Sequence, residues 1–85
     1  MTYQVRFTQT SLRQFDKLEK STKQRITSKL ESIAEDPLAN VKRLRGVNVY
    51  SLRVGDYRAI LSIENKIMLI LVLEIGHRST IYRNY

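Results

Sequence analysis

Apolar and polar residues alternate in three stretches of the chain, and a period of two is typical of a half-buried β-strand. The first stretch covers residues 3–7, and the other two cover residues 49–54 and 57–64. Between the second and the third lies Gly55-Asp56, a pair that fits the two-residue turn of a β-hairpin. The pattern therefore predicts an N-terminal strand and, much later in the chain, an antiparallel hairpin.

A nearly continuous apolar run follows the hairpin over residues 67–75, broken only by Glu74. Such a run is typical of a central strand with little solvent on either face. Asn65-Lys66 separates it from the preceding strand, so the last three strands should form an antiparallel meander. A central strand needs a second neighbour, and we expect it to pair with the N-terminal strand, the only long one left.

Helical spacing first appears after Thr8 or Thr10, either of which can act as an N-cap. Leu12, Phe15 and Leu18 then recur every three residues and predict a short helix with one apolar stripe.

A second helix is predicted to begin at Ser21, in a capping box in which Gln24 reaches back to the cap. Pro37 should end it at about Asp36, because proline cannot continue a helix. Its expected buried face consists of Ile26, Leu30, Ile33 and Ala34. The two helices together form a helical hairpin.

These elements predict an α+β fold: an N-terminal strand, a helical hairpin and then a three-stranded antiparallel meander, within one domain over residues 1–85. Residues 42–46 are expected to be a basic connector, which Leu44 anchors while the charges stay in water. A chain this short removes only about 60 to 65% of its unfolded surface from water, so the core should be thin.

The net charge is +7, and most of the excess lies in residues 42–85, which carry eight basic and three acidic side chains. Such a charge either keeps a small domain soluble or binds an acidic partner, and the uneven distribution favours the partner. The sequence has no cysteine, no signal-like apolar block at its N-terminus and no apolar run long enough to span a bilayer. We therefore expect a cytoplasmic protein without a membrane segment.

Two arginines should face each other across the predicted hairpin. If Gly55-Asp56 is a two-residue turn, counting outward places Arg53 directly opposite Arg58, on the face that also carries Ser51. Like charges at such a position are destabilising by some tenths of a kcal/mol. The two arginine side chains either point away from each other into solvent or bind an anion together, and the sequence does not decide between these alternatives.

The residues that carry chemistry are few in kind. One histidine, no cysteine and no convergent pair of carboxylates predict no metal site, and three scattered glycines make no phosphate-binding loop. His77 is the only candidate base, with no acid clearly placed to orient it. Arginine and tyrosine suit RNA, because guanidinium groups bind phosphate and aromatic rings stack on bases. RNA also supplies its own nucleophile, the 2′-hydroxyl, so no cofactor is expected.

Several short motifs resemble, in their order and spacing, the RelE branch of the RelE/ParE toxin superfamily. They are Leu44-Arg45-Gly46, Tyr50 with its alternating strand, Gly55-Asp56-Tyr57-Arg58, Gly76-His77-Arg78 and Tyr82. The resemblance implies a helical hairpin packed on a largely antiparallel sheet. It also implies a ribosome-dependent endonuclease that cuts messenger RNA in the A site without a metal. The partners implied are the ribosome, messenger RNA and an acidic RelB-like antitoxin, in a higher-order hetero-oligomer.

The resemblance also assigns roles to residues. Arg58 matches the arginine that stabilises the transition-state phosphate, and Arg78 the arginine proposed as general acid or charge stabiliser. Tyr82 matches a tyrosine that stacks on or orients the substrate base, although a C-terminal aromatic can also simply pack on the sheet. The expected catalytic set is Arg53, Arg58, Arg78 and Tyr82, and the expected RNA-binding set is Lys42, Arg43, Arg45, Ser51 and His77.

The second strand departs from the family pattern, because Ser51 and Arg53 stand where RelE enzymes have two lysines. Arginine is a poor general base, and serine cannot replace a lysine. The proton acceptor is therefore open, with His77 or a water as the candidates. The alternative function is a ParE-like toxin that inhibits DNA gyrase without cutting RNA, or a catalytically weak relative that retains antitoxin binding.

Overall fold

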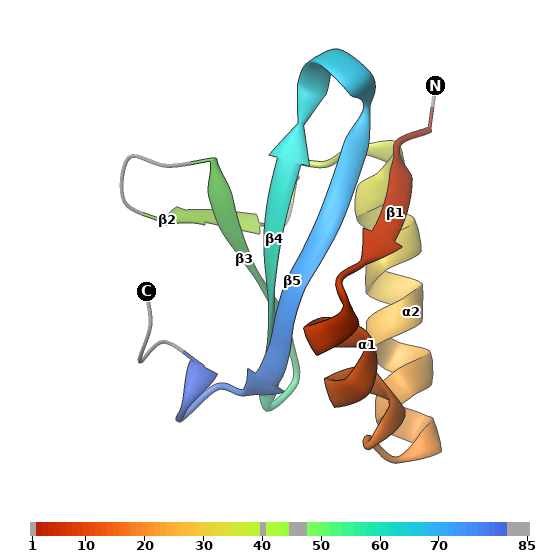
Figure 1. Ribbon diagram of the computed structural model, residues 1–85, viewed down its shortest axis with the longest axis vertical. Coiled ribbons are helices and arrows are strands. Elements are labelled where there is room, and N and C mark those ends of the chain that lie inside the picture. Colours follow the sequence, from red (N-terminus) through yellow and green to blue (C-terminus); the bar gives the residue numbers. More distant parts are fainter. Residues whose placement is uncertain (1, 40, 45–47, 82–85) are drawn as a thin grey trace.

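A computed structural model describes residues 2–39, 41–44 and 48–81 of the chain. Its elements are β1 (Gln4–Phe7), α1 (Gln9–Asp16), α2 (Lys20–Glu35), β2 (Val41–Leu44), β3 (Val49–Val54), β4 (Tyr57–Glu64), the 3₁₀ turn η1 (Asn65–Ile67) and β5 (Leu69–His77). The strands form one sheet in the order β1-β5-β4-β3-β2, with β1 and β2 at its edges (Figure 1). Among the strand pairs formed by the described residues, the β1–β5 pair alone is parallel.

The predicted α+β fold is confirmed, including the β3-β4-β5 meander and the pairing of the N-terminal strand with β5. The prediction was wrong for residues 42–44, which belong to an edge strand, β2, and not to a connector. The strand was missed because it contains Lys42 and Arg43, and a short basic run is typical of a solvent-exposed connector. Charged side chains are nevertheless what an edge strand needs, since they discourage further pairing with other chains.

β5 begins two residues later than the apolar run suggested. Asn65–Ile67 forms the 3₁₀ turn, and Met68 then adopts the left-handed conformation with φ +51°. Ile67 is consequently exposed on this turn, and the strand starts at Leu69. At its other end β5 extends past the apolar run as far as His77.

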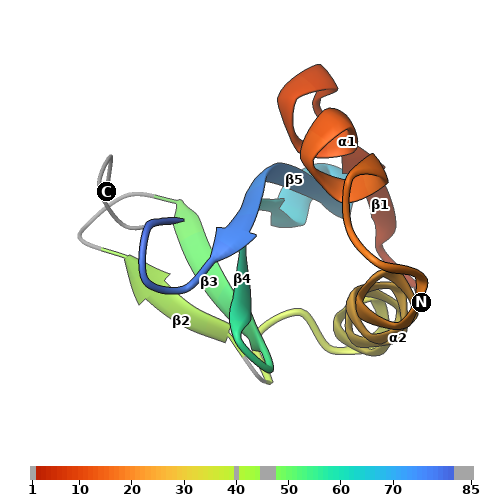
Figure 2. The ribbon, with the colours of Figure 1, turned by 90° about the horizontal axis from the view of Figure 1, so that it is seen from below.

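α1 covers the part of the β5 edge that β1 leaves without a neighbouring strand. β1 pairs with β5 only as far as Val72. From Val72 onward, polar side chains of α1 make hydrogen bonds to the backbone of β5. Ser11 Oγ donates to the carbonyl of Val72 at 2.7 Å, and Gln14 Oε1 accepts from the amide of Ile75 at 2.7 Å. Thr8, not Thr10, is the N-cap and accepts from the Ser11 amide. Figure 2 shows α1 beside β5.

α2 begins before the predicted capping box. Its N-cap is Glu19, without a side-chain hydrogen bond, and the Lys23 amide already donates to the Glu19 carbonyl at 2.9 Å. Ser21 therefore lies inside the first turn and cannot cap it. The predicted end is confirmed, with Asp36 as the C-cap just before Pro37. The buried face is also confirmed and consists of Ile26, Leu30, Ile33 and Ala34.

The main core lies between α2 and one face of the sheet. The strands contribute Leu52, Val54, Ala59, Leu61, Ile63, Ile70, Val72 and Ile75. Phe15 and Leu18 of the predicted α1 stripe pack against this core, with the Phe15 ring 5.3 Å from that of Phe7. Leu12 does not, because its side chain is 48% exposed. The opposite face of the sheet, called the open face below, is not covered by α2.

Candidate functional site

On the open face, residues that pair across neighbouring strands form rows that run across the sheet. Gly55-Asp56 is a two-residue turn, so Val54 pairs with Tyr57, and Arg53 faces Arg58 as predicted. Gly76 of β5 completes this row, called the arginine row. The next row consists of Lys42, Ser51, Ile60 and Glu74, one from each of β2, β3, β4 and β5.

The two arginines of the arginine row are held in different ways. Arg58 is half-buried, and its Nη1 donates to Ser51 Oγ at 3.3 Å. Arg53 is exposed, and its Nε donates to the Gly55 carbonyl at 3.4 Å. The hydrogen bonds draw Arg58 toward the next row and Arg53 toward the turn. The two like charges are therefore directed to different positions along the strands.

Ser51 holds the Arg58 side chain through a hydrogen bond. Its side chain is only 2% exposed and accepts the hydrogen bond from the guanidinium. A hydroxyl that is buried and engaged in this way is suited to fixing the angle of Arg58. It is poorly suited to reaching a substrate itself.

Two buried isoleucines lie outside the main core, on the side of the sheet that carries the arginine row. Ile60 is fully buried there although it is outside the main core, and Ile81 is 8% exposed. Ile81 reaches this face because Gly76 has no side chain, and its Cδ1 lies 3.0 Å from where a Cβ of Gly76 would be. Figure 2 shows the turn that carries Ile81 on the far side of β4 from α2. Buried apolar side chains therefore lie next to the row that carries Arg58.

The turn after β5 is tied to the β3–β4 turn, since the Arg78 amide donates to the Asp56 carbonyl at 2.9 Å. Arg78 is thus anchored at the end of the sheet that carries the arginine row, and its side chain is exposed. His77 pairs with Tyr57, which places it on the opposite face from Gly76. Its ring contacts the Tyr57 ring at 5.7 Å, and Nδ1 lies 2.8 Å from Ser79 Oγ.

The remaining expected residues are only partly brought together. Lys42 pairs with Ser51 and shares the open face, whereas Arg43 pairs with Tyr50 and belongs to the other face. Both side chains are exposed. Arg45 and Tyr82 lie outside the described residues.

Glu74 is the open-face residue that sequence reasoning missed. It pairs with Ile60, is half-buried and stands one row from Arg58, so it brings a carboxylate to the face that also carries Lys42, Arg53 and Arg58. Its signal was present in the sequence as the one charge in an apolar run. The sequence could not show which face of the sheet Glu74 occupies. A bulge in β5 shifts the register between the residue that pairs with Ile60 and the residue that pairs with Leu61.

Two general properties complete the description of the site. In the ranges that the structure describes, no three histidine or acidic side chains lie close enough to hold a metal ion together. The described helices are too short or too polar to cross a membrane.

Comparison with known proteins connects this arrangement to a family. The family model for the ParE toxin of the type II toxin–antitoxin system parDE matches residues 5–82, which is nearly the whole chain. The chain belongs to this toxin family. A putative RelE-like toxin protein of Escherichia coli is 29% identical to the toxin over 81 residues, covering 92% of the chain and 85% of the relative.

Solved structures agree with this assignment to the RelE/ParE toxins. The toxin superimposes on a chain of the RelBE2 toxin–antitoxin complex of Mycobacterium tuberculosis with a TM-score of 0.84, 28% identity and coverage of 93% and 94% of the two chains. The RelE–RelB complex of Pyrococcus horikoshii gives a TM-score of 0.83, 26% identity and coverage of 94% and 99%. The resemblance inferred from the motifs is thereby confirmed.

Proposed function

We propose that the toxin is a ribosome-dependent endoribonuclease that cuts messenger RNA in the A site and so inhibits translation. The observation that carries the proposal is the cross-strand pair of Arg53 and Arg58 on the open face, with Arg58 oriented by Ser51. A fixed guanidinium beside a second cation is suited to a phosphate whose negative charge grows during reaction. We choose RNA as the substrate because the motifs resemble those of the RelE branch and a RelE-like toxin is among the relatives.

The proposed reaction is a transesterification that needs no metal. The 2′-hydroxyl attacks the adjacent phosphorus, a 2′-O–P bond forms, and the P–O5′ bond breaks, leaving a 2′,3′-cyclic phosphate and a 5′-hydroxyl. Arg58 stabilises the charge on the phosphate, with Arg53 beside it. Arg78 stabilises or protonates the departing O5′, and Tyr82 orients the base. Lys42, Arg43, Arg45 and His77 contact the RNA outside the reacting phosphate, and Ser51 contributes through Arg58.

Glu74 is our candidate for the group that accepts the proton of the 2′-hydroxyl. Ser51 is buried beneath Arg58, and His77 lies on the opposite face, so neither is well placed for this task. Glu74 shares the open face with Arg58 and stands one row away. A positioned carboxylate is a suitable general base, contributing about 10² to 10⁴ in rate.

The proposal is tested with purified toxin and ribosomes programmed with a defined message. We expect codon-spaced cuts whose rate falls about 10²-fold to 10³-fold in Arg58→Ala, the usual effect of removing one donor to a developing oxyanion. Glu74→Gln should lower the rate and change its pH profile, and Arg13→Ala, an exposed cation on α1, should leave it unchanged. Intact message in every reaction would overturn the proposal.

The second candidate function is inhibition of DNA gyrase through a protein interface. It is favoured by the ParE description of the matching family and by Ser51 at the position of a family lysine. A supercoiling assay run beside the ribosome assay separates the two candidates. Inhibited supercoiling with intact message would select the gyrase inhibitor.

We further propose that an acidic RelB-like antitoxin neutralises the toxin in the cytoplasm, within a higher-order hetero-oligomer. The net charge of +7 and the toxin–antitoxin complexes among the similar structures support this partner. Co-expression with the neighbouring open reading frame and light scattering of the purified complex would give its composition. A toxin that purifies alone under those conditions would count against the proposal.

A further inference from the structure

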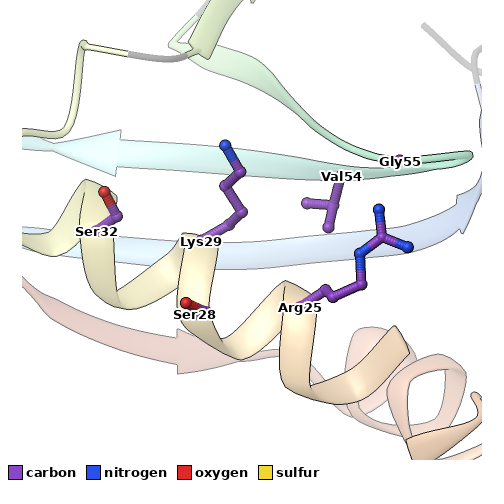
Figure 3. Close-up of a pocket in the computed structure, with 6 residues that line it drawn as sticks. All are labelled: Arg25, Ser28, Lys29, Ser32, Val54 and Gly55. Carbon is purple, nitrogen blue, oxygen red and sulfur yellow. The ribbon is translucent and has the colours of Figure 1, made fainter. Parts of the chain in front are cut away.

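A second basic site lies on the other side of the sheet from the arginine row. A cavity of about 380 Å³ opens between α2 and the end of β3 and is called the α2 cleft below. It is lined by Arg25, Ser28, Lys29, Ser32, Val54 and Gly55. Figure 3 shows Arg25 and Lys29 extending from α2 toward the β3–β4 hairpin.

The helix supplies a uniform set of hydrogen-bond donors to this cleft. Positions 25, 28, 29 and 32 are three and four residues apart, so they form one stripe next to the buried face of α2. They contribute two cations and two hydroxyls, and none of the six lining residues is acidic. The one apolar lining residue, Val54, is buried and offers little surface to a ligand. These donors suit an oxyanion.

The glycine in the turn brings the cleft close to the arginine row. Arg25 Nη2 lies 2.7 Å from where a Cβ of Gly55 would be, so the guanidinium rests directly on the turn. The carbonyl of the same Gly55 accepts the hydrogen bond from Arg53 on the open face. The α2 cleft and the arginine row therefore lie on opposite sides of the same Gly55-Asp56 turn.

We propose that the α2 cleft binds a backbone phosphate of RNA that passes around the Gly55-Asp56 turn. This rests on the proposed function, which places the reacting phosphate of the RNA on the open face. A phosphate suits the cleft better than an acidic peptide does, because a peptide site needs apolar anchors. An apolar groove exists elsewhere, between α1, α2 and β1, and its lining includes Val5, Phe7, Leu12 and Phe15.

The test measures binding and not cleavage, so its failure is separable from failure of the nuclease proposal. The probe is a fluorescent 2′-O-methylated RNA oligonucleotide, which lacks the attacking hydroxyl and stays intact. Its affinity is measured against salt concentration for the double variant Arg25→Ala/Lys29→Ala and for Arg13→Ala/Lys66→Ala, a control with the same loss of charge from exposed positions outside the cleft. Circular dichroism checks that both variants are folded.

Each cation that contacts phosphate contributes about 0.7 to the slope of log affinity against log salt for a single strand. We therefore expect the cleft variant to lose about 1.4 of the slope and the control to lose almost none. Ser28→Ala/Ser32→Ala, which changes no charge, should weaken binding about fivefold through lost hydrogen bonds. The proposal is overturned if the cleft and control variants have equal slopes here and also bind ribosomes equally well, whether or not the toxin cuts RNA.

A second arm identifies the source of the phosphate. Binding of the same variants to intact 70S ribosomes is measured by co-sedimentation, without added message. A defect with ribosomes alone assigns the phosphate to ribosomal RNA, and a defect with the oligonucleotide assigns it to a single strand such as the message. If both RNA arms are unchanged while a poly-glutamate peptide binds more weakly, the cleft is a peptide site and the proposal is wrong.

Discussion

Substitution of Ser51 by alanine tests whether this residue acts through Arg58. The change removes the hydroxyl that accepts from Arg58 Nη1 and introduces no new bulk into a site that is only 2% exposed. The arginine keeps its charge and its place in β4. Ser51→Ala therefore loosens the orientation of the guanidinium without deleting it.

The size of the effect follows from the hydrogen bond. Bonds to a charged group contribute about 1.5 to 3 kcal/mol, but this one is long at 3.3 Å and its donor is half-buried, so we take about 1 kcal/mol. If that energy serves only to orient Arg58 in the transition state, the cleavage rate at saturating ribosomes should fall about fivefold. The ribosome concentration that gives half the maximal rate should not change, because ground-state binding is untouched.

The assay is a double-mutant cycle on the rate of message cleavage. Ser51→Ala is compared in the wild type and in Arg58→Ala, where it should have no further effect, because the hydrogen bond is already absent. Ser62→Ala is the matched control, since its hydroxyl is on the same face but donates to Glu64. A fivefold loss that persists in Arg58→Ala would refute the positioning role, as would full activity of Ser51→Ala itself.

Four further substitutions test the fold, each by urea denaturation. Ser11→Ala should cost about 1 kcal/mol and not 3, because the carbonyl that Ser11 bonds still accepts from the Thr8 amide. Gly55→Ala should cost about 1 to 2 kcal/mol, because the residue has φ +59°. Ile60→Ala should cost about 2 to 5 kcal/mol at a fully buried position, whereas Ile67→Ala, 68% exposed, should stay within about 0.5. Equal losses at positions 60 and 67 would contradict the burial of Ile60 on the open face.

Hydrophobic periodicity was sufficient to predict the hairpin and its register. The Gly55-Asp56 turn fixes the pairing, and a period of two then determines which side chains face each other, as Arg53 and Arg58 do. The same logic failed at β2, where four residues are too few to show alternation and two of them are charged. It also failed at the start of α2, because the Ser21 to Gln24 pattern fits a capping box that lies within the helix.

The candidate site was harder to predict, because it depends on which face of the sheet each residue occupies. Neighbouring residues in a strand point to opposite faces, so Lys42 and Arg43 are separated although both looked like one basic patch. Glu74 could be placed only once the bulge in β5 was known. The α2 cleft gives no sequence signal, since Arg25 and Lys29 look like an ordinary solvated helix face until the hairpin lies beside them.

The parallel pairing of β1 with β5 has a mechanical consequence. Force applied at Gln4 and at His77 pulls the two strands along their length in opposite directions, so every hydrogen bond between them is loaded at once. Force applied to β2 at the other edge of the sheet can peel its bonds to β3 one after another. The toxin should therefore resist extension from its first and last strands and yield much more readily when it is pulled from β2.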